Sequence, residues 1–145
     1  MKAIRYATYG PPEVLELVDV PEPEPGPSQI RIAVRAVGIN PIDWKVRSGA
    51  MGSGELPRGT GVEAAGVVET VGSALDGVAV GDRVFGPAAG AAAELALMSD
   101  FAQIPDGLDF AGAAALPVAV ETATRCLDQV GVESGQTLLI NGGMA

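Results

Sequence analysis

The sequence predicts a mostly β fold in which short strands wind around a small barrel and are joined by tight turns and short helices. Its composition supports this, because 20 glycines and 11 prolines with only 4% aromatic residues favour turns and strands over long helices. Residues 57–87 alternate apolar runs with glycine-containing turns. Residues 29–37 alternate apolar side chains with Arg31 and Arg35, so one face is expected to be buried. The two arginines should then face water or a second domain.

The N-terminal quarter predicts a hairpin followed by a stiff connector. Residues 2–6 are expected to form the first strand, residues 10–12 (GPP) a turn, and residues 14–18 the partner strand. The segment 21–27, PEPEPGP, can be neither a helix nor a central strand, because proline lacks the N–H that both require. It predicts an extended connector on the surface.

A short helix is predicted after the strand at 29–37. Asn40 precedes Pro41, and Asp43 stands at the third helical position, which gives an N-cap, a proline in the first turn and an acid near the positive helix end. Gly49 can end the helix. Asn40 and Asp43 therefore have a complete structural explanation without any further role.

The central stretch predicts strands that approach one another closely. Gly66 interrupts the apolar run 64–68, where a missing side chain suggests a bulge or a close backbone contact. Glu63 precedes this run. It is expected to be a structural carboxylate held by nearby N–H groups or by Arg58 or Arg83, and alternatively a polar wall of a cleft.

The last third predicts short strands followed by helices. Residues 94–97 and 101–104 are expected to be strands, with a turn at 98–100 between them. Asp109 can cap a short helix over residues 110–116 that stops before Pro117.

A second helix is predicted over residues 119–130, ending at Gly131. Cys126 within it is expected to be a buried, inert thiol, because no base is in view. The run at 136–140 (QTLLI) is typical of a strand buried in a parallel sheet.

Charge and residue content exclude several classes of function. The net charge of −9 disfavours nucleic acids and anionic membranes as partners. A single cysteine excludes an internal disulfide and fits a reducing cytoplasm. No apolar run is long enough to span a membrane, and no signal peptide is evident. Because the chain has no histidine and one cysteine, we expect no zinc site and no histidine-based catalysis within it.

One set of motifs is specific in combination. The pattern P-x-G-x-G-x-E-x-A-G-x-V at 57–68, then Val71-Gly72 and the G-D-R-V of 81–84, resembles medium-chain dehydrogenases/reductases, and within them the zinc-free quinone oxidoreductases. The resemblance extends over nearly the whole chain. It implies a GroES-like barrel over residues 1–118, followed at 119–145 by a linking helix and the first strand of a truncated Rossmann domain.

The resemblance also implies site residues. The G-x-N-P-x-D of residues 38–43 is similar to the family segment beneath the nicotinamide ring, so Asn40 and Asp43 are the candidate catalytic residues. Asn40 stands where zinc members have a cysteine ligand, and Val62 where they have a histidine. Asn40 is also a candidate cofactor contact.

Further cofactor contacts are implied near the end of the chain. Thr122 matches a family threonine near the nicotinamide, although an ordinary helix position explains it equally well. Gly142 and Gly143 follow the strand at 136–140, as in the phosphate loop of a dinucleotide-binding unit. The implied cofactor is NADPH, with no zinc.

The expected function is hydride transfer from NADPH to a quinone or enone-type substrate, in a cytoplasmic homodimer that uses no metal. The alternatives are a co-chaperonin-like binding module, a catalytically silent family member and an enoyl reductase. A lone parallel strand cannot pair its edges. We therefore expect the chain to be part of a longer protein and to be inactive alone. Its residues beyond about 130 are expected to be poorly ordered or to pair with another copy of the chain.

Overall fold

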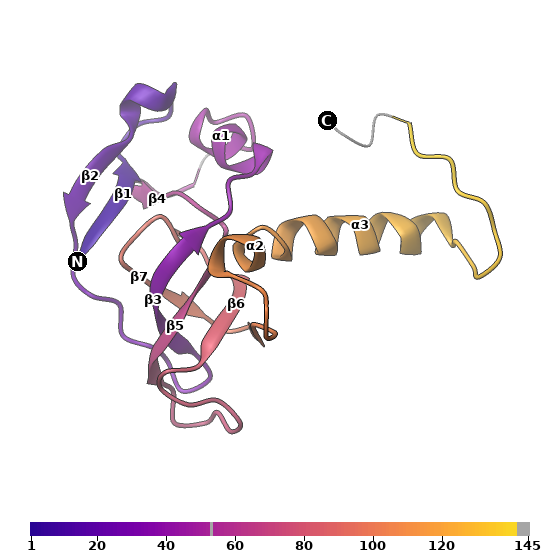
Figure 1. Ribbon diagram of the computed structural model, residues 1–145. Helices are drawn as coiled ribbons and strands as arrows, with labels where there is room; N and C mark the ends of the chain where they lie inside the picture. The colour runs from indigo at the N-terminus through magenta and orange to yellow at the C-terminus, as the bar shows by residue number, and fades with distance from the viewer. Residues whose placement is uncertain (53, 142–145) are drawn as a thin grey trace.

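The computed structural model describes residues 1–52 and 54–141, which form two antiparallel sheets and three α-helices (Figure 1). The smaller sheet has the order β2-β1-β4 and the larger the order β7-β3-β5-β6-β8. The strands are β1 (Lys2–Tyr6), β2 (Glu16–Asp19), β3 (Ile30–Val37), β4 (Arg58–Gly59), β5 (Glu63–Val71), β6 (Arg83–Pro87), β7 (Leu95–Met98) and β8 (Ala102–Gln103). The mostly β prediction is confirmed, but these strands do not close into a barrel.

The N-terminal hairpin forms as predicted. β1 pairs antiparallel with β2, and the register places Lys2 opposite Asp19, whose side chains form an exposed ion pair at 2.6 Å. A short 3₁₀ helix, η1 (Pro12–Val14), makes the connection, so β2 begins two residues later than expected.

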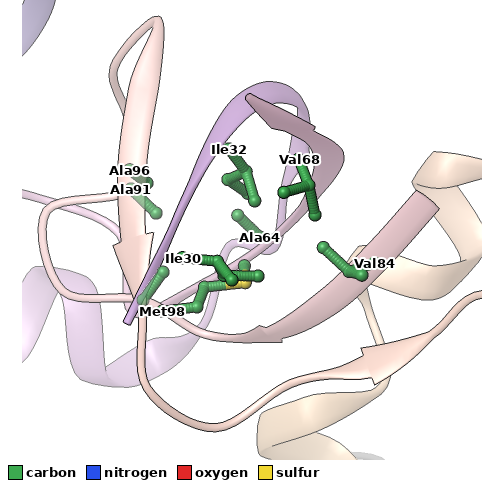
Figure 2. Close-up of a cluster of buried hydrophobic side chains, with 9 residues drawn as sticks. Ile30, Ile32, Ala64, Val68, Val84, Ala91, Ala96 and Met98 are labelled. Atoms are coloured by element: carbon green, nitrogen blue, oxygen red, sulfur yellow. The ribbon is translucent and has the colours of Figure 1, made fainter. Parts of the chain in front are cut away.

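The core lies on the concave face of the larger sheet, where apolar residues of β3, β5, β6 and β7 meet (Figure 2). Ile30, Ile32, Val68, Val84 and Met98 are fully buried there. Each side chain of this size contributes about 1.5–3 kcal/mol when it is removed from water. These contacts hold β3 against β5, the strand that carries the site described below.

Gly66 in β5 makes the close approach that the sequence predicts. It lies opposite Val34 in the β3–β5 register, and a Cβ at this position would overlap the carbonyl oxygen of Ala33. The register shifts twice along this pair of strands, as at β-bulges.

The two short strands predicted within residues 94–104 form, with a bend between them. They are β7 and β8, and they lie at opposite edges of the larger sheet. The edges of a flat five-stranded sheet are about 19 Å apart, whereas the chain from Met98 to Ala102 spans at most about 14 Å. The sheet must therefore curve strongly, and the turn at residues 99–101 crosses between its edges.

Arg31 also differs from expectation. Its side chain is only 15% exposed, because the connector at 21–27 covers it. The Nη1 atom donates to the Pro23 carbonyl at 3.3 Å and lies 3.6 Å from a Glu22 oxygen, while Nε lies 3.8 Å from Glu69. Arg35 is exposed, as predicted.

The helices are α1 (Pro41–Arg47), α2 (Phe110–Ala114) and α3 (Pro117–Val130). Asp109 caps α2 as predicted, because its Oδ1 accepts the Gly112 N–H at 2.7 Å. Figure 1 shows α3 projecting away from both sheets. Cys126 on α3 is exposed, so the prediction of a buried thiol is wrong. No helix in the described part of the chain is long and apolar enough to cross a membrane.

The strand predicted at 136–140 does not form. These residues have no regular structure and are exposed, and none of the described strands pairs with them. Gly142 and Gly143 lie outside the described residues.

Candidate functional site

The first residue of β5, Glu63, is 1% exposed and is the one buried charged residue among those described. Its Oε1 accepts a hydrogen bond from Asn40 Nδ2 at 2.5 Å, and its Oε2 accepts one from the Val118 backbone N–H at 2.7 Å. Both carboxylate oxygens are therefore paired with donors, as a buried charge requires.

Glu63 acts as the missing cap of α3. The N-cap position of that helix is Leu116, which has no side chain able to accept a hydrogen bond. Val118 carries one of the first-turn N–H groups that a helix leaves unpaired. The Glu63 carboxylate accepts it, and the positive end of the helix dipole favours the negative charge there.

Neither Arg58 nor Arg83, the two expected partners, forms an ion pair with the Glu63 carboxylate. Arg83 donates instead from Nη2 to the Leu108 carbonyl at 2.7 Å, and its guanidinium lies 4.8 Å from the Phe110 ring centre. Arg58 has no ion pair with Glu63. The prediction of backbone N–H partners is confirmed by Val118, and the arginine alternative is wrong.

Gly38 makes room for this arrangement. A Cβ on this buried glycine would overlap the carboxylate of Glu63 and come within 2.6 Å of the Ala114 carbonyl oxygen. The Gly38 N–H also donates to the Glu63 backbone carbonyl at 3.3 Å. The site therefore requires a residue without a side chain two positions before Asn40.

Asn40 begins α1 as predicted, with help from Asp43. The Asn40 backbone N–H donates to Asp43 Oδ2 at 2.8 Å, and the Asp43 N–H donates to the Asn40 carbonyl at 3.0 Å. The Asn40 side-chain oxygen faces that same N–H in a capping-box arrangement but makes no hydrogen bond with it. Its amide NH₂ is directed to Glu63, a partner that the sequence did not reveal.

Asp43 holds two segments together. Besides accepting from Asn40, it accepts the Gly61 N–H on Oδ1 at 3.2 Å. Both oxygens are thus engaged with backbone donors. Asp43 is placed to fix α1 against the residues that precede β5.

Thr122 lies on α3 four residues after Val118, about 6 Å further along the helix axis. It is exposed, and its hydroxyl donates to Glu121 at 3.5 Å. Glu63 links Asn40 to the first turn of this helix, so the candidates Asn40 and Thr122 lie on adjoining elements. The sequence did contain a signal for this contact. The helix start at Leu116-Pro117 has no capping side chain, so an acceptor from elsewhere in the chain is needed for the Val118 N–H.

Two grooves are lined by neighbours of the Asn40–Glu63 pair, although neither groove is lined by Asn40 or Glu63 itself. One of about 720 Å³ lies between the hairpin and the end of β3, and Gly38 and Asp43 line it. The other, of about 710 Å³, lies between β6 and the start of α3, and it is lined by Phe85, Phe101 and Val118 among other largely apolar residues. The described residues contain no group of three or more Asp, Glu, Cys or His side chains that could hold a metal ion.

Comparison with known proteins places this geometry in a family. The family described as "Alcohol dehydrogenase GroES-like domain" matches residues 26–129. A quinone oxidoreductase of Pseudomonas aeruginosa is 42% identical over 146 residues, which cover 97% of this chain and 45% of the relative. A 2-methylene-furan-3-one reductase of Solanum lycopersicum is 37% identical, over 99% of this chain and 41% of the relative.

A solved structure agrees with these sequence matches. The quinone oxidoreductase of Escherichia coli, complexed with NADPH, has a TM-score of 0.83 and 34% identity, over 90% of this chain and 41% of that one. The chain spans a little under half the length of the curated relatives it matches. It belongs to the medium-chain dehydrogenases/reductases of the quinone oxidoreductase type, and it carries their GroES-like domain.

Proposed function

We propose that this chain is the GroES-like part of an NADPH-dependent oxidoreductase that transfers hydride to a quinone or another enone-type acceptor without a metal ion. The observation that carries the proposal is the contact of Asn40 with Glu63 beside the start of α3. Two further facts support the proposal: Asn40 and Thr122 lie on adjoining elements, and the chain is 42% identical to a quinone oxidoreductase. The proposed boundary lies near residue 118, with 119–145 belonging to the nucleotide-binding part.

The polar groups at the site fit the nicotinamide end of such a cofactor. Asn40 offers a half-buried amide and Thr122 an exposed hydroxyl, both neutral groups suited to a carboxamide. The apolar groove beside Val118 can exclude water from a flat ring. NADPH, when bound, supplies the hydride. Gly142 and Gly143 are proposed to contact its phosphates.

In this proposal the protein mainly orients and desolvates the reactants. Asn40 and Thr122 would hydrogen-bond the cofactor, and Asp43 would hold α1 in place through its two backbone contacts. The names of the relatives support a quinone or an enone as the acceptor. A homodimer, a cytoplasmic location and the absence of zinc remain predictions, as does an enoyl substrate as the alternative.

A chimera tests the proposal. Residues 1–145 would replace the matching segment of the Pseudomonas aeruginosa relative, and NADPH oxidation would be followed at 340 nm with a panel of quinones and enones. We expect turnover by the chimera and none by the isolated chain. Asn40→Ala and Thr122→Ala should each raise KM for NADPH in the chimera, whereas Glu69→Gln, an exposed change on the same strand as Glu63, should not.

Two outcomes of the chimera experiment would count against the proposal. A chimera that folds and binds NADPH but reduces no acceptor would favour a catalytically silent member. One whose NADPH affinity is unchanged by both alanine substitutions would overturn the assigned site.

A further inference from the structure

The orientation of the Asn40 side chain is fixed by the chemistry of its partner. The Asn40 amide nitrogen donates to Glu63 Oε1 at 2.5 Å, which matches the acceptor character of a carboxylate oxygen. The amide oxygen then faces the start of α1, as the capping-box arrangement shows. The two neighbours agree on one orientation of the amide.

We propose that Glu63 is a positioning residue: it fixes the orientation of the Asn40 amide and ties it to the first turn of α3. This inference rests on the proposed function. Its consequence for a ligand is specific. An amide NH₂ has two N–H donors, and Glu63 accepts one of them. The second N–H makes the site a hydrogen-bond donor, which suits a carbonyl oxygen such as that of a carboxamide or a quinone.

Glu63 also limits how far the two parts of the site can separate. Asn40 is carried by the segment between β3 and α1, and Val118 belongs to a helix that makes few other contacts with the sheets (Figure 1). One buried carboxylate contacts both. Without it, α3 would lose its cap and Asn40 would be free to rotate.

A residue swap separates this role from simple core packing. Asn40→Asp alone places two carboxylates in contact, and we expect it to lower Tm by roughly 5–10 °C. Glu63→Gln alone should cost less, because the introduced amide can still accept from Val118 while the Asn40 amide turns over. The double variant should recover most of the loss. The introduced glutamine would accept from Val118 and donate to the introduced aspartate.

In the double variant, Tm and the KM for NADPH should respond differently. In the chimera described above, the double variant should regain Tm but keep a KM for NADPH roughly tenfold above the parent, because position 40 would present acceptor oxygens in place of an N–H. Glu69→Gln is the matched control for the loss of a charge on β5, since its side chain is 42% exposed. Recovery of both Tm and KM by the double variant would overturn the positioning role.

An NMR measurement on the 145-residue chain tests the Asn40–Glu63 contact without any cofactor. The chain has two asparagines, and exposed Asn141 serves as an internal reference for the side-chain amide signals of Asn40 in ¹H–¹⁵N spectra. We expect the Asn40 pair to be displaced from the Asn141 pair, and Glu63→Gln to move both the Asn40 pair and the Val118 signal. Coincident asparagine signals, or no response to Glu63→Gln, would refute the contact itself. An inactive chimera whose Asn40 signals are displaced would count against the proposed function alone.

Discussion

The Asn40 amide donates to the carboxylate of Glu63 across 2.5 Å in a site where Glu63 is 1% exposed. The same carboxylate accepts the N–H of Val118, so the start of α1, the start of β5 and the start of α3 meet at one buried charge. Removing either partner of the Glu63 carboxylate should destabilise the fold strongly, because an unpaired buried charge would remain. Substitutions around it should therefore affect both the sheet and the helix.

Gly38→Ala should be strongly destabilising. The added methyl group would overlap the Glu63 carboxylate and crowd the Ala114 carbonyl oxygen, and the carboxylate cannot move without breaking its hydrogen bonds to Asn40 and Val118. We expect a loss of about 2–3 kcal/mol in the free energy of unfolding, measured by urea denaturation. Gly26→Ala is the control, since its nearest neighbour is the end of the Gln29 side chain at 3.3 Å. Equal effects of the two would contradict the packing described here.

Asp43→Ala should cost more than Asp109→Ala. Each aspartate serves a short helix, but Asp109 accepts one backbone N–H, whereas Asp43 accepts those of Asn40 and Gly61. Loss of an ordinary cap costs about 1 kcal/mol, so we expect about 2 kcal/mol for Asp43→Ala. Urea denaturation of the two variants gives the comparison. A smaller effect at Asp43 would mean that its second contact contributes nothing.

Local patterns in the sequence predicted most of the elements, because each depends on neighbouring residues. The alternation at 29–37 gave β3, the Asn40-Pro41 pair gave the start of α1, and Gly66 marked a close strand contact. The strand at 136–140 failed for a physical reason. An apolar run forms a strand only when another strand pairs with it, and the run itself does not show whether one is present.

Long-range pairings were not predictable from the same patterns. Nothing local indicates that β7 and β8 lie at opposite edges of one sheet, since this depends on the curvature of all five strands. The Glu63 contacts join residues far apart in the sequence. Arginines were the obvious partners for a glutamate, but an amide and a helix N-terminus satisfy it instead.

Arg31→Met should destabilise the protein most at low salt. The guanidinium is the cation beside Glu22, Glu24 and Glu69, and its removal leaves three acids together. Because these glutamates are 42–85% exposed, we expect only about 1 kcal/mol. Measured by urea denaturation, the difference in unfolding free energy between Arg31→Met and the wild type should shrink as the NaCl concentration rises. Arg35→Met, at an exposed position on the same strand, should show little salt dependence. A gap independent of salt would rule out the electrostatic explanation.

Cys126 should react in the native protein. It is the single cysteine of the chain and lies exposed on α3. We expect Ellman's reagent to modify about one thiol per chain at pH 8 without denaturant, at a rate close to that of the unfolded protein in urea. A native thiol that reacts only after urea is added would mean that α3 is covered in solution, for example by a second copy of the chain.

Tyr6 should ionise at unusually high pH. It is 2% exposed, and burial raises its pKa above the usual 10.0, against the opposing charge of nearby Arg58. The folded state therefore holds the phenol proton more tightly than the unfolded state. The resulting stability is complete below pH 10 and declines as pH rises toward the folded pKa. Absorbance at 295 nm in Tyr9→Phe, which leaves Tyr6 as the remaining tyrosine, should show a midpoint above 10.

Urea denaturation at several pH values gives a second measure of the same effect. The unfolding free energy of the wild type should fall above pH 10, and Tyr6→Phe should remove the part of that fall that is due to the phenol. The matched Tyr9→Phe variant should retain most of it, since burial, the largest cause of the raised Tyr6 pKa, remains when Tyr9, a smaller cause, is removed. A Tyr6 midpoint at or below 10 in the folded chain would show that water reaches the phenol, and that the junction between β1 and β4 is looser than the structure indicates.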